Sequence, residues 1–388
     1  MDAERLTETF DAVEPLTVGL EEEVMLLEPD TLDLAECAPA LLRRLGDGPS
    51  PLKLELPASQ IELVTPPRRS VPDAIADLGA ARDELLVAAT GLARPAAAGA
   101  HPFSAAEGAL NPGARYERAA AEYGWAARRQ LVCALQVHVA VGGSARTLGV
   151  YNALRGELPA LAALAANAPL RGGQDTGLAS VRPLISGLLP RQGIPPALAS
   201  WDEFADNLRW GATAGTIPEP GFWWWELRPH PRFGTLELRV PDTQTTITDA
   251  AAVAAVAHAV VVELAERHDA GDLEPPAPSW RIAENRWSAS RYGMEGTLAD
   301  LRSGEPVPTR DRVEALIDRL EPVAERIGAG ALLTDARRLA HRNGASRQRA
   351  IAAESGPRGL TRWLADRFGD GLDQHRGFAS PSRVTERV

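Results

Sequence analysis

Four segments in the first 240 residues alternate polar and apolar side chains, and this pattern limits the possible folds more than any other feature. They span residues 18–27, 52–65, 131–141 and 223–240, the last folding back on itself as an antiparallel pair. Successive side chains of a strand point to opposite faces. The strands are not regularly followed by crossover helices with glycine-rich starts, which disfavours a parallel nucleotide-binding sheet. Because helical patterns follow Thr248, we expect an α+β protein with a mostly antiparallel sheet.

We expect one domain over residues 1–370, strand-rich to about residue 242 and helical after it, followed by a loose C-terminal tail over 371–388. With 45% hydrophobic residues the chain has enough apolar material for a large core. The apolar stretch 250–264 contains His258 and falls short of the roughly 20 residues that span a bilayer. Two cysteines and a polar N-terminus suggest a cytoplasmic protein that does not enter membranes.

The charged residues exclude several kinds of function. The net charge of −11 gives no general attraction for nucleic acids or anionic membranes. Lys53 is the only lysine, so the chain lacks the Gly-Lys-Ser/Thr of a phosphate-binding P-loop and has little scope for Schiff-base chemistry. An anionic ligand must therefore be held by arginine, backbone N–H groups or a metal ion.

Carboxylates and an imidazole recur on one side of the predicted strands. Glu21 and Glu23 share a face, whereas Glu22 takes the other. Two carboxylates on one face repel each other unless a cation lies between them. Charged residues that protect an edge strand are the alternative explanation.

The other strands repeat this pattern. Glu55 and Glu62 lie in the second extended region, and Gln136 and His138 point the same way from the third. Each has a simpler explanation when taken alone, because Glu62 can point to solvent and His138 can be a hydrogen-bonded core residue.

In the last strand, Glu237 and Arg239 share a face and form either an ion pair or a metal ligand beside a phosphate clamp. If the strands are neighbours in one sheet, their acidic and imidazole groups form a candidate metal site. Oxygen donors with one imidazole suit Mg²⁺ or Mn²⁺, and such metals beside arginines suit nucleoside triphosphate chemistry. The proposed metal ligands are Glu21, Glu23, Glu55, Glu62, His138 and Glu237.

Several motifs in this order resemble one known family. The chain is similar to the bacterial type-2 glutamate–cysteine ligase (YbdK-like) group of carboxylate–amine ligases over roughly residues 17 to 295. The resemblance rests on Gly19-Leu20-Glu21-Glu22-Glu23, Ser59 to Pro66, Gly99 to Phe103, Cys133 to Val139, Leu158-Pro159 with Ala165 to Pro169, Asp175-Thr176-Gly177, Arg228 to Asp242 and Glu284 to Gly293.

The resemblance implies a glutamine-synthetase-like fold, in which a curved antiparallel sheet forms a funnel with helices outside. It implies that ATP phosphorylates a carboxylate and that an amine then attacks the acyl phosphate to form an amide. The six metal ligands above would hold Mg²⁺. Arg239 would meet the transferring phosphoryl group, with Arg228 also binding the nucleotide and with Glu62 and Glu237 as catalytic residues. Small amino-acid-like carboxylates and amines would be the partners, and homo-oligomers occur in the family.

Departures from the family pattern imply altered substrates. Gln136 stands where the family usually has histidine, Ala100 replaces a threonine and Ala168 replaces a serine. We expect the substrates to contact His101, Gln136, Asn167 and Arg171. Two alternatives remain open, namely a metal-dependent amide or ester hydrolase without ATP, and a non-catalytic ligand-binding relative.

Overall fold

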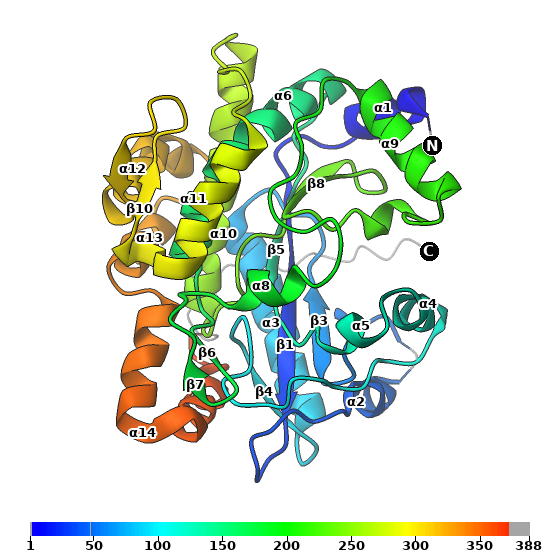
Figure 1. Cartoon of the computed structure of the whole chain (residues 1–388), viewed down its shortest axis with the longest axis vertical. Coiled ribbons are helices and arrows are strands. Elements are labelled where there is room, and N and C mark those ends of the chain that lie inside the picture. The colour runs from blue at the N-terminus through cyan, green and yellow to red at the C-terminus, as the bar shows by residue number, and fades with distance from the viewer. Residues whose placement is uncertain (1, 47, 372–388) are drawn as a thin grey trace, which may run out of the picture.

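A computed structural model describes residues 2–46 and 48–371 of the chain, so the predicted tail lies outside the described residues except for Gly371. The described part combines helices with a main antiparallel sheet (Figure 1). The strands are β1 (Val18–Leu27), β2 (Leu52–Leu54), β3 (Gln60–Val64), β4 (Arg94–Ala96), β5 (Leu135–Val139), β6 (Leu170–Arg171), β7 (Gln174–Asp175), β8 (Leu227–His230), β9 (Thr235–Leu238), β10 (Thr297–Ala299) and β11 (Pro306–Pro308).

Within the described residues, seven strands form the main sheet in the order β2-β3-β1-β5-β9-β8, and β4 pairs with β1. Every pairing is antiparallel. The two short pairs β6-β7 and β10-β11 form separate small sheets. This arrangement confirms the expected α+β class with an antiparallel sheet.

The helices vary from single turns to long core helices. They are α1 (Ala3–Asp11), α2 (Ala38–Leu45), α3 (Val71–Ala89), α4 (Ala114–Tyr123), α5 (Trp125–Arg128), α6 (Ser144–Leu154), α7 (Leu158–Leu164), α8 (Arg182–Ser186), α9 (Trp201–Thr213), α10 (Ile247–Asp269), α11 (Ser279–Tyr292), α12 (Thr309–Arg326), α13 (Leu332–His341) and α14 (Gly344–Arg367), with 3-10 turns η1 (Arg155–Glu157), η2 (Pro220–Phe222) and η3 (Gly293–Glu295).

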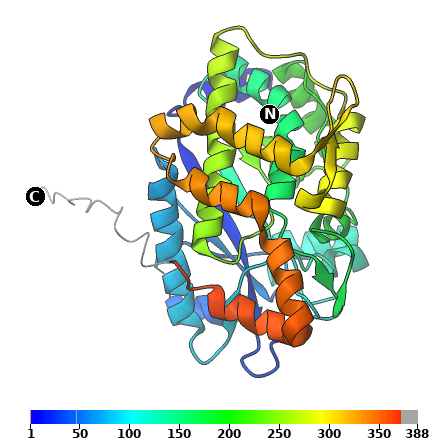
Figure 2. The same ribbon diagram turned by 90° about the vertical axis from the view of Figure 1, so that its left-hand side faces the viewer.

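One face of the sheet is apolar and is covered by helices. Alternate residues of β1, such as Leu20 and Val24, pack in the main core with Leu63 and Val137 of the neighbouring strands. Helices α3 and α10 contact this sheet and each other, and they lie in front of it in Figure 2. We call this side the apolar face.

Among the described residues, helix α10 is long and apolar enough to span a membrane. It is longer than the apolar stretch that the sequence analysis considered. However, 89% of its most apolar window is buried inside the protein. The helix begins where Thr246 caps it by accepting a hydrogen bond from the Asp249 backbone N–H. It is therefore a helix of the protein core.

A buried ion pair joins the apolar face to α3. Glu22 points away from Glu21 and Glu23, and both its oxygens accept hydrogen bonds from the guanidinium of Arg82, at 2.6 and 2.8 Å. Neither side chain is exposed at all. The remaining guanidinium hydrogens go to the backbone oxygens of Gln244, Thr245 and Phe368. The predicted alternation along β1 is thus confirmed by the opposite direction of Glu22.

Some local predictions differ from the structure. The segment 131–141, predicted as one long strand, pairs only over Leu135–Val139, which is β5. The hairpin β10-β11 was not predicted, because Pro306 and Pro308 argue against a strand. Helix α14 is kinked at Gly356, which has a φ of +70°.

Candidate active site

The register of the sheet gathers the predicted carboxylates on one side. Glu23 lies opposite Glu62, and His138 lies opposite Glu237. Directly paired residues of an antiparallel ladder project from the same face. Glu21 likewise pairs with Gln136, and Glu237 with Arg228. We call this side the polar face, formed by Glu21, Glu23, Glu55, Glu62, Gln136, His138, Arg228, Glu237 and Arg239.

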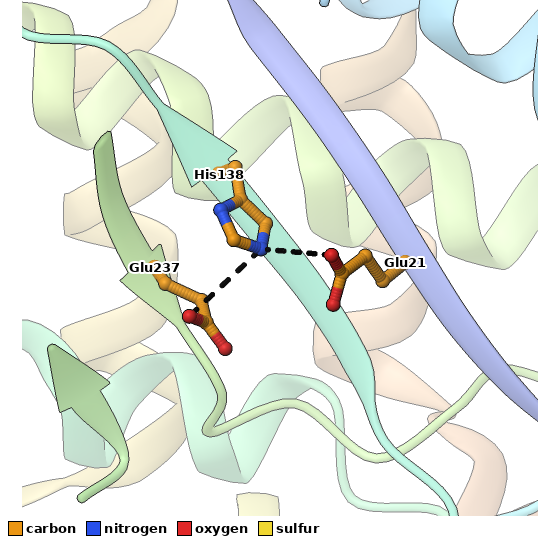
Figure 3. Close-up of side chains that lie close together, drawn as sticks. All are labelled: Glu21, His138 and Glu237. Atoms are coloured by element: carbon orange, nitrogen blue, oxygen red, sulfur yellow. Dashed lines mark ion pairs between the residues drawn. The ribbon is translucent and has the colours of Figure 1, made fainter. Parts of the chain in front are cut away.

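Three residues from three adjacent strands converge at one end of the polar face (Figure 3). The Nε2 atom of His138 lies 3.4 Å from Glu21 Oε1 and 4.0 Å from Glu237 Oε2. One ligand atom from each of the three lies within 4.8 Å of the others. Nδ1 of His138 lies 3.0 Å from the Thr235 hydroxyl, whereas the buried Nε2 has no hydrogen-bond partner among the described residues. This donor set can hold a metal ion.

The electrostatics of these three residues favour separated charges. Burial acts to raise the pKa of Glu237, but the guanidinium groups of Arg228 and Arg239 hold it well below its usual value. Burial also acts to raise the pKa of Glu21, and the imidazole of His138 lowers it overall. The pKa of His138 is raised despite burial, because Glu237 and Glu21 are negative. A bound metal ion would replace the proton that these carboxylates stabilise on the imidazole.

A second group of carboxylates lies further along the polar face. Burial and the charge of Glu55 raise the pKa of Glu23 to about 7. Burial and the charges of Glu21, Glu55 and Glu23 raise the pKa of Glu62 well above its usual value. Like charges that raise each other's pKa are relieved by a cation between them. This group is therefore a second candidate cation site.

A chain of hydrogen bonds connects the two groups. Glu23 accepts hydrogen bonds from the Ala134 backbone N–H at 2.7 Å and from the Gln136 amide at 2.9 Å. The oxygen of that amide accepts a hydrogen bond from Arg239 Nη1 at 2.8 Å. Arg239 also donates to Glu237, which accepts a second hydrogen bond from Arg228. Gln136 thus fixes the distance between Arg239 and Glu23.

The polar face borders two cavities of unlike size. A wide cavity of about 990 Å³ includes Glu21 and His138 in its lining, with arginines and Phe233 around them. A narrow cavity of about 120 Å³ includes Glu23, Glu55 and Arg239. The hydrogen-bonded chain through Gln136 therefore begins at Glu23 in the narrow cavity and reaches Glu237, which lies 4.0 Å from His138 of the wide cavity.

His101 and Asn167 were predicted to contact substrate, and their side chains form hydrogen bonds with backbone groups. His101 is fully buried, its Nε2 lies 2.8 Å from the Leu32 oxygen, and its Nδ1 accepts from the N–H groups of Phe103 and Ser104. Asn167 is also fully buried and donates to the Thr243 oxygen. Neither side chain belongs to the described lining of the two cavities. Both side chains therefore have structural roles, and their contact with substrate stays a prediction.

The predicted substrate contact of Arg171 also stays a prediction. Its guanidinium donates to the backbone oxygens of Leu131 and Ala106, and it is absent from the described lining of both cavities. The family departures Ala100 and Ala168 pack together in a small apolar cluster. Of the three departures, Gln136 alone therefore belongs to the polar face within the described residues.

Sequence reasoning missed several residues of the narrow cavity. Gln60 precedes Glu62 by two positions in the same strand, so the alternation could have revealed it. Arg115, Tyr116 and Trp224 also line the cavity. Arg115 and Tyr116 come from α4, and no local pattern relates that helix to the strands. Trp224 lies in the alternating segment 223–240, so its position relative to Arg228 could have revealed it.

The comparisons with known proteins agree with this geometry. A family model described as glutamate–cysteine ligase family 2 matches residues 17–363. A protein of Rubrobacter xylanophilus, provisionally named glutamate–cysteine ligase 2-3, is 41% identical over 354 residues, which are 89% of this chain and 95% of that protein. A Thermobifida fusca protein, provisionally named glutamate–cysteine ligase 2, is 36% identical over 90% of both chains.

A solved structure is similar in fold. The glutamate–cysteine ligase of Francisella tularensis, in complex with AMP, superposes with a TM-score of 0.67 and covers 94% of this chain and 90% of its own. Its sequence identity is 12%, so the likeness concerns the fold alone.

Proposed function

Since this chain belongs to the glutamate–cysteine ligase family 2, we propose that it is an ATP- and Mg²⁺-dependent ligase that joins an amino-acid carboxylate to an amine. Family membership makes it an enzyme of the class that forms C–N bonds. The observation that carries the nucleotide and metal proposal is the convergence of Glu21, His138 and Glu237 beside two arginines.

The donor atoms fit a hard divalent cation. Carboxylate oxygens dominate the polar face, the single imidazole has an Nε2 without a hydrogen-bond partner among the described residues, and Glu23 and Glu62 have raised pKa values. Mg²⁺ or Mn²⁺ suits this set better than zinc. When bound, such an ion neutralises phosphate oxygens and favours transfer of the terminal phosphoryl group. We assign Glu21, Glu23, Glu55, Glu62, His138 and Glu237 as its ligands.

We assign the nucleotide to the wide cavity, the amine to the narrow one and the carboxylate substrate to the polar face between them. The wide cavity offers Arg68, Arg69 and Arg232 for phosphates. Arg239 faces the narrow cavity while bonded to Glu237, so it can contact a phosphoryl group that passes between the two. Arg228 orients Glu237 from the other side. The Francisella tularensis ligase, solved with AMP, supports nucleotide use by this fold.

The reaction has two steps. The carboxylate oxygen attacks the γ-phosphorus, the bond to the β–γ bridging oxygen breaks, and ADP and an acyl phosphate form. The amine nitrogen then attacks the acyl carbon, the C–O bond to phosphate breaks, and the nitrogen loses a proton. The arginines stabilise charge that develops on the phosphoryl oxygens in the first step.

We also propose that the sheet forms one wall of a glutamine-synthetase-like funnel and that residues 1–370 act as one catalytic domain. The position of the polar face between the two cavities supports the funnel. A cytoplasmic location and homo-oligomers stay predictions from the sequence.

The decisive experiment measures ADP release with Mg²⁺ and ATP across a panel of amino-acid carboxylates, with and without amines. We expect ADP only with particular pairs, together with an amide detected by mass spectrometry. Metal-dependent hydrolysis of amides or esters without nucleotide would instead support the hydrolase alternative. Nucleotide binding without turnover on any pair, or no nucleotide binding, would support a non-catalytic relative.

A further inference from the structure

The narrow cavity has two unlike sides. Glu23 and Arg239 of the polar face line one side. Four aromatic rings line the other, and we call them the aromatic wall, formed by Tyr116 and Tyr123 of α4 with Phe222 and Trp224. The ring of Trp224 lies 5.3 Å from that of Tyr123 and 5.0 Å from that of Phe222, so these three rings form one continuous surface.

The two tyrosine hydroxyls of this wall already form hydrogen bonds with the protein. The Tyr116 hydroxyl donates to the Leu54 backbone oxygen at 2.7 Å. The Tyr123 hydroxyl accepts a hydrogen bond from Arg191 at 3.1 Å. A ligand in the narrow cavity therefore meets ring surface here, and ring surface favours an apolar group.

One polar atom of the cavity is unsatisfied. Gln60 is 1% exposed and lines the narrow cavity, yet its Oε1 has no hydrogen-bond partner within residues 2–46 and 48–371. A buried acceptor without a donor is unfavourable, and native proteins seldom retain one without a reason. The missing partner is a donor, and the N–H of an amine supplies one.

The size of the cavity limits the apolar group. Its volume is about 120 Å³. An apolar cavity of roughly 150 Å³ holds a benzene ring. One ring or a branched chain of similar size fits against the aromatic wall, whereas the side chain of cysteine would leave much of that surface uncovered.

We propose that the amine substrate is a primary amine carrying a ring-sized apolar group, which packs on the aromatic wall while its nitrogen donates to Gln60 Oε1. This inference rests on the proposed ligase function and names the amine class that the narrow cavity selects. The acyl phosphate forms beside Glu23 and Arg239, so the same cavity holds the nitrogen next to the acyl carbon.

The test compares amines of different size in the ADP-release assay with L-glutamate and L-aspartate as carboxylates. The probes are 2-phenylethylamine and L-phenylalanine against glycine and L-cysteine. We expect kcat/KM to be at least about tenfold higher with a phenyl-bearing amine, because burying a ring contributes this much or more. Quenching of tryptophan fluorescence by 2-phenylethylamine provides a readout that requires no turnover.

Two variants test the aromatic wall from opposite directions. Trp224→Ala removes ring surface and should lower the ratio of kcat/KM for 2-phenylethylamine to that for glycine at least about tenfold. Ala119→Leu adds a larger side chain to the cavity lining and should lower the same ratio by blocking the ring. Trp280→Ala is the matched control, because this exposed tryptophan is outside the described lining of the cavity.

Gln60→Leu tests the orphan acceptor. It should raise KM for 2-phenylethylamine about tenfold or more, while thermal melting verifies that the variant is folded.

The possible failures are distinguishable. If L-cysteine or glycine is the preferred amine and Trp224→Ala leaves the ratio unchanged, the amine inference is overturned while the ligase function stands. If no pair releases ADP and no nucleotide binds, the proposed function is rejected and the amine inference with it.

Discussion

Two arginine–glutamate arrangements lie on opposite sides of the same sheet, and they differ in how completely their charges are satisfied. On the apolar face, Glu22 and Arg82 form a two-point pair with no exposed surface, and three backbone oxygens take the remaining guanidinium hydrogens. On the polar face, Glu237 is held by Arg228 and Arg239, but further carboxylates surround it.

The difference shows that arginine–glutamate pairs can have a structural role on the apolar face and a proposed functional role on the polar face. The Glu22–Arg82 pair has one cation for one anion, and none of its polar atoms is left to bind a ligand. The polar face has five carboxylates for two guanidinium groups, and its imidazole Nε2 has no hydrogen-bond partner within the described residues. An excess of buried negative charge is tolerable when a cation completes it.

The largest expected effect comes from Glu237. Glu237→Gln removes the charge that two arginines and the metal site share, and we expect kcat to fall by about a thousandfold or more. Circular dichroism and thermal melting should show a folded protein, because the amide still accepts a hydrogen bond. Glu62→Gln should behave alike, and the exposed Glu354→Gln is the control. Full activity of both site variants would refute the metal assignment.

Breaking the Glu22–Arg82 pair should lower the stability of the fold and leave catalysis unaffected. Arg82→Met leaves Glu22 buried without its cation, and we expect a loss of about 3–5 kcal/mol of unfolding free energy in urea titrations. The double variant Arg82→Met with Glu22→Leu should recover most of this loss, since no buried charge remains. A large fall in kcat per folded molecule of the double variant would show that the two faces are not independent.

A histidine of the apolar face should make stability depend on pH. Burial lowers the pKa of His258 to about 4, and its Nε2 donates to the Leu16 oxygen at 2.9 Å. The folded protein disfavours the charged ring, so the stabilisation is complete above pH 6.5 and is lost as the pH falls towards 4. We expect a loss of about 3 kcal/mol over this range. His258→Gln keeps a donor without titrating, and the difference between its pH profile and the wild-type profile isolates this loss.

The smallest expected effect concerns the link between the two carboxylate groups. Gln136→Met keeps the size of the side chain but removes both hydrogen bonds, and we expect kcat to fall about tenfold. Gln136→Glu keeps an acceptor for Arg239 and adds a charge beside Glu23, so its activity should be lower still without added metal. A Gln136→Met enzyme as active as the wild type would mean that Arg239 is positioned by Glu237 alone.

The sequence predicted the polar face because strand alternation is a local property. The shared direction of Glu21 and Glu23, and the opposite direction of Glu22, follow from the period of a strand alone. The register that puts Glu23 opposite Glu62 depends on contacts between distant segments, so only the family resemblance hinted at it.

The predicted substrate residues show the limit of motif reasoning. His101 and Asn167 belong to recurring motifs, but their side chains form hydrogen bonds with backbone groups. A motif can therefore mark a residue that stabilises the fold as well as one that contacts a ligand. Conversely, Arg115 and Tyr116 belong to no motif, since helices and strands brought together by the fold have no common pattern in sequence.

The bond from Arg82 to the Phe368 backbone oxygen joins residues 286 positions apart, and the guanidinium also lies over the Phe368 ring. During synthesis, the sheet and α3 leave the ribosome long before this partner exists. A nascent chain therefore contains a cation in its core that is short of an acceptor until residue 368 emerges. Contacts of such sequence separation form late. The final packing of α3 should accordingly be a late event in folding, and chains stopped before residue 368 should be open to proteases and chaperones.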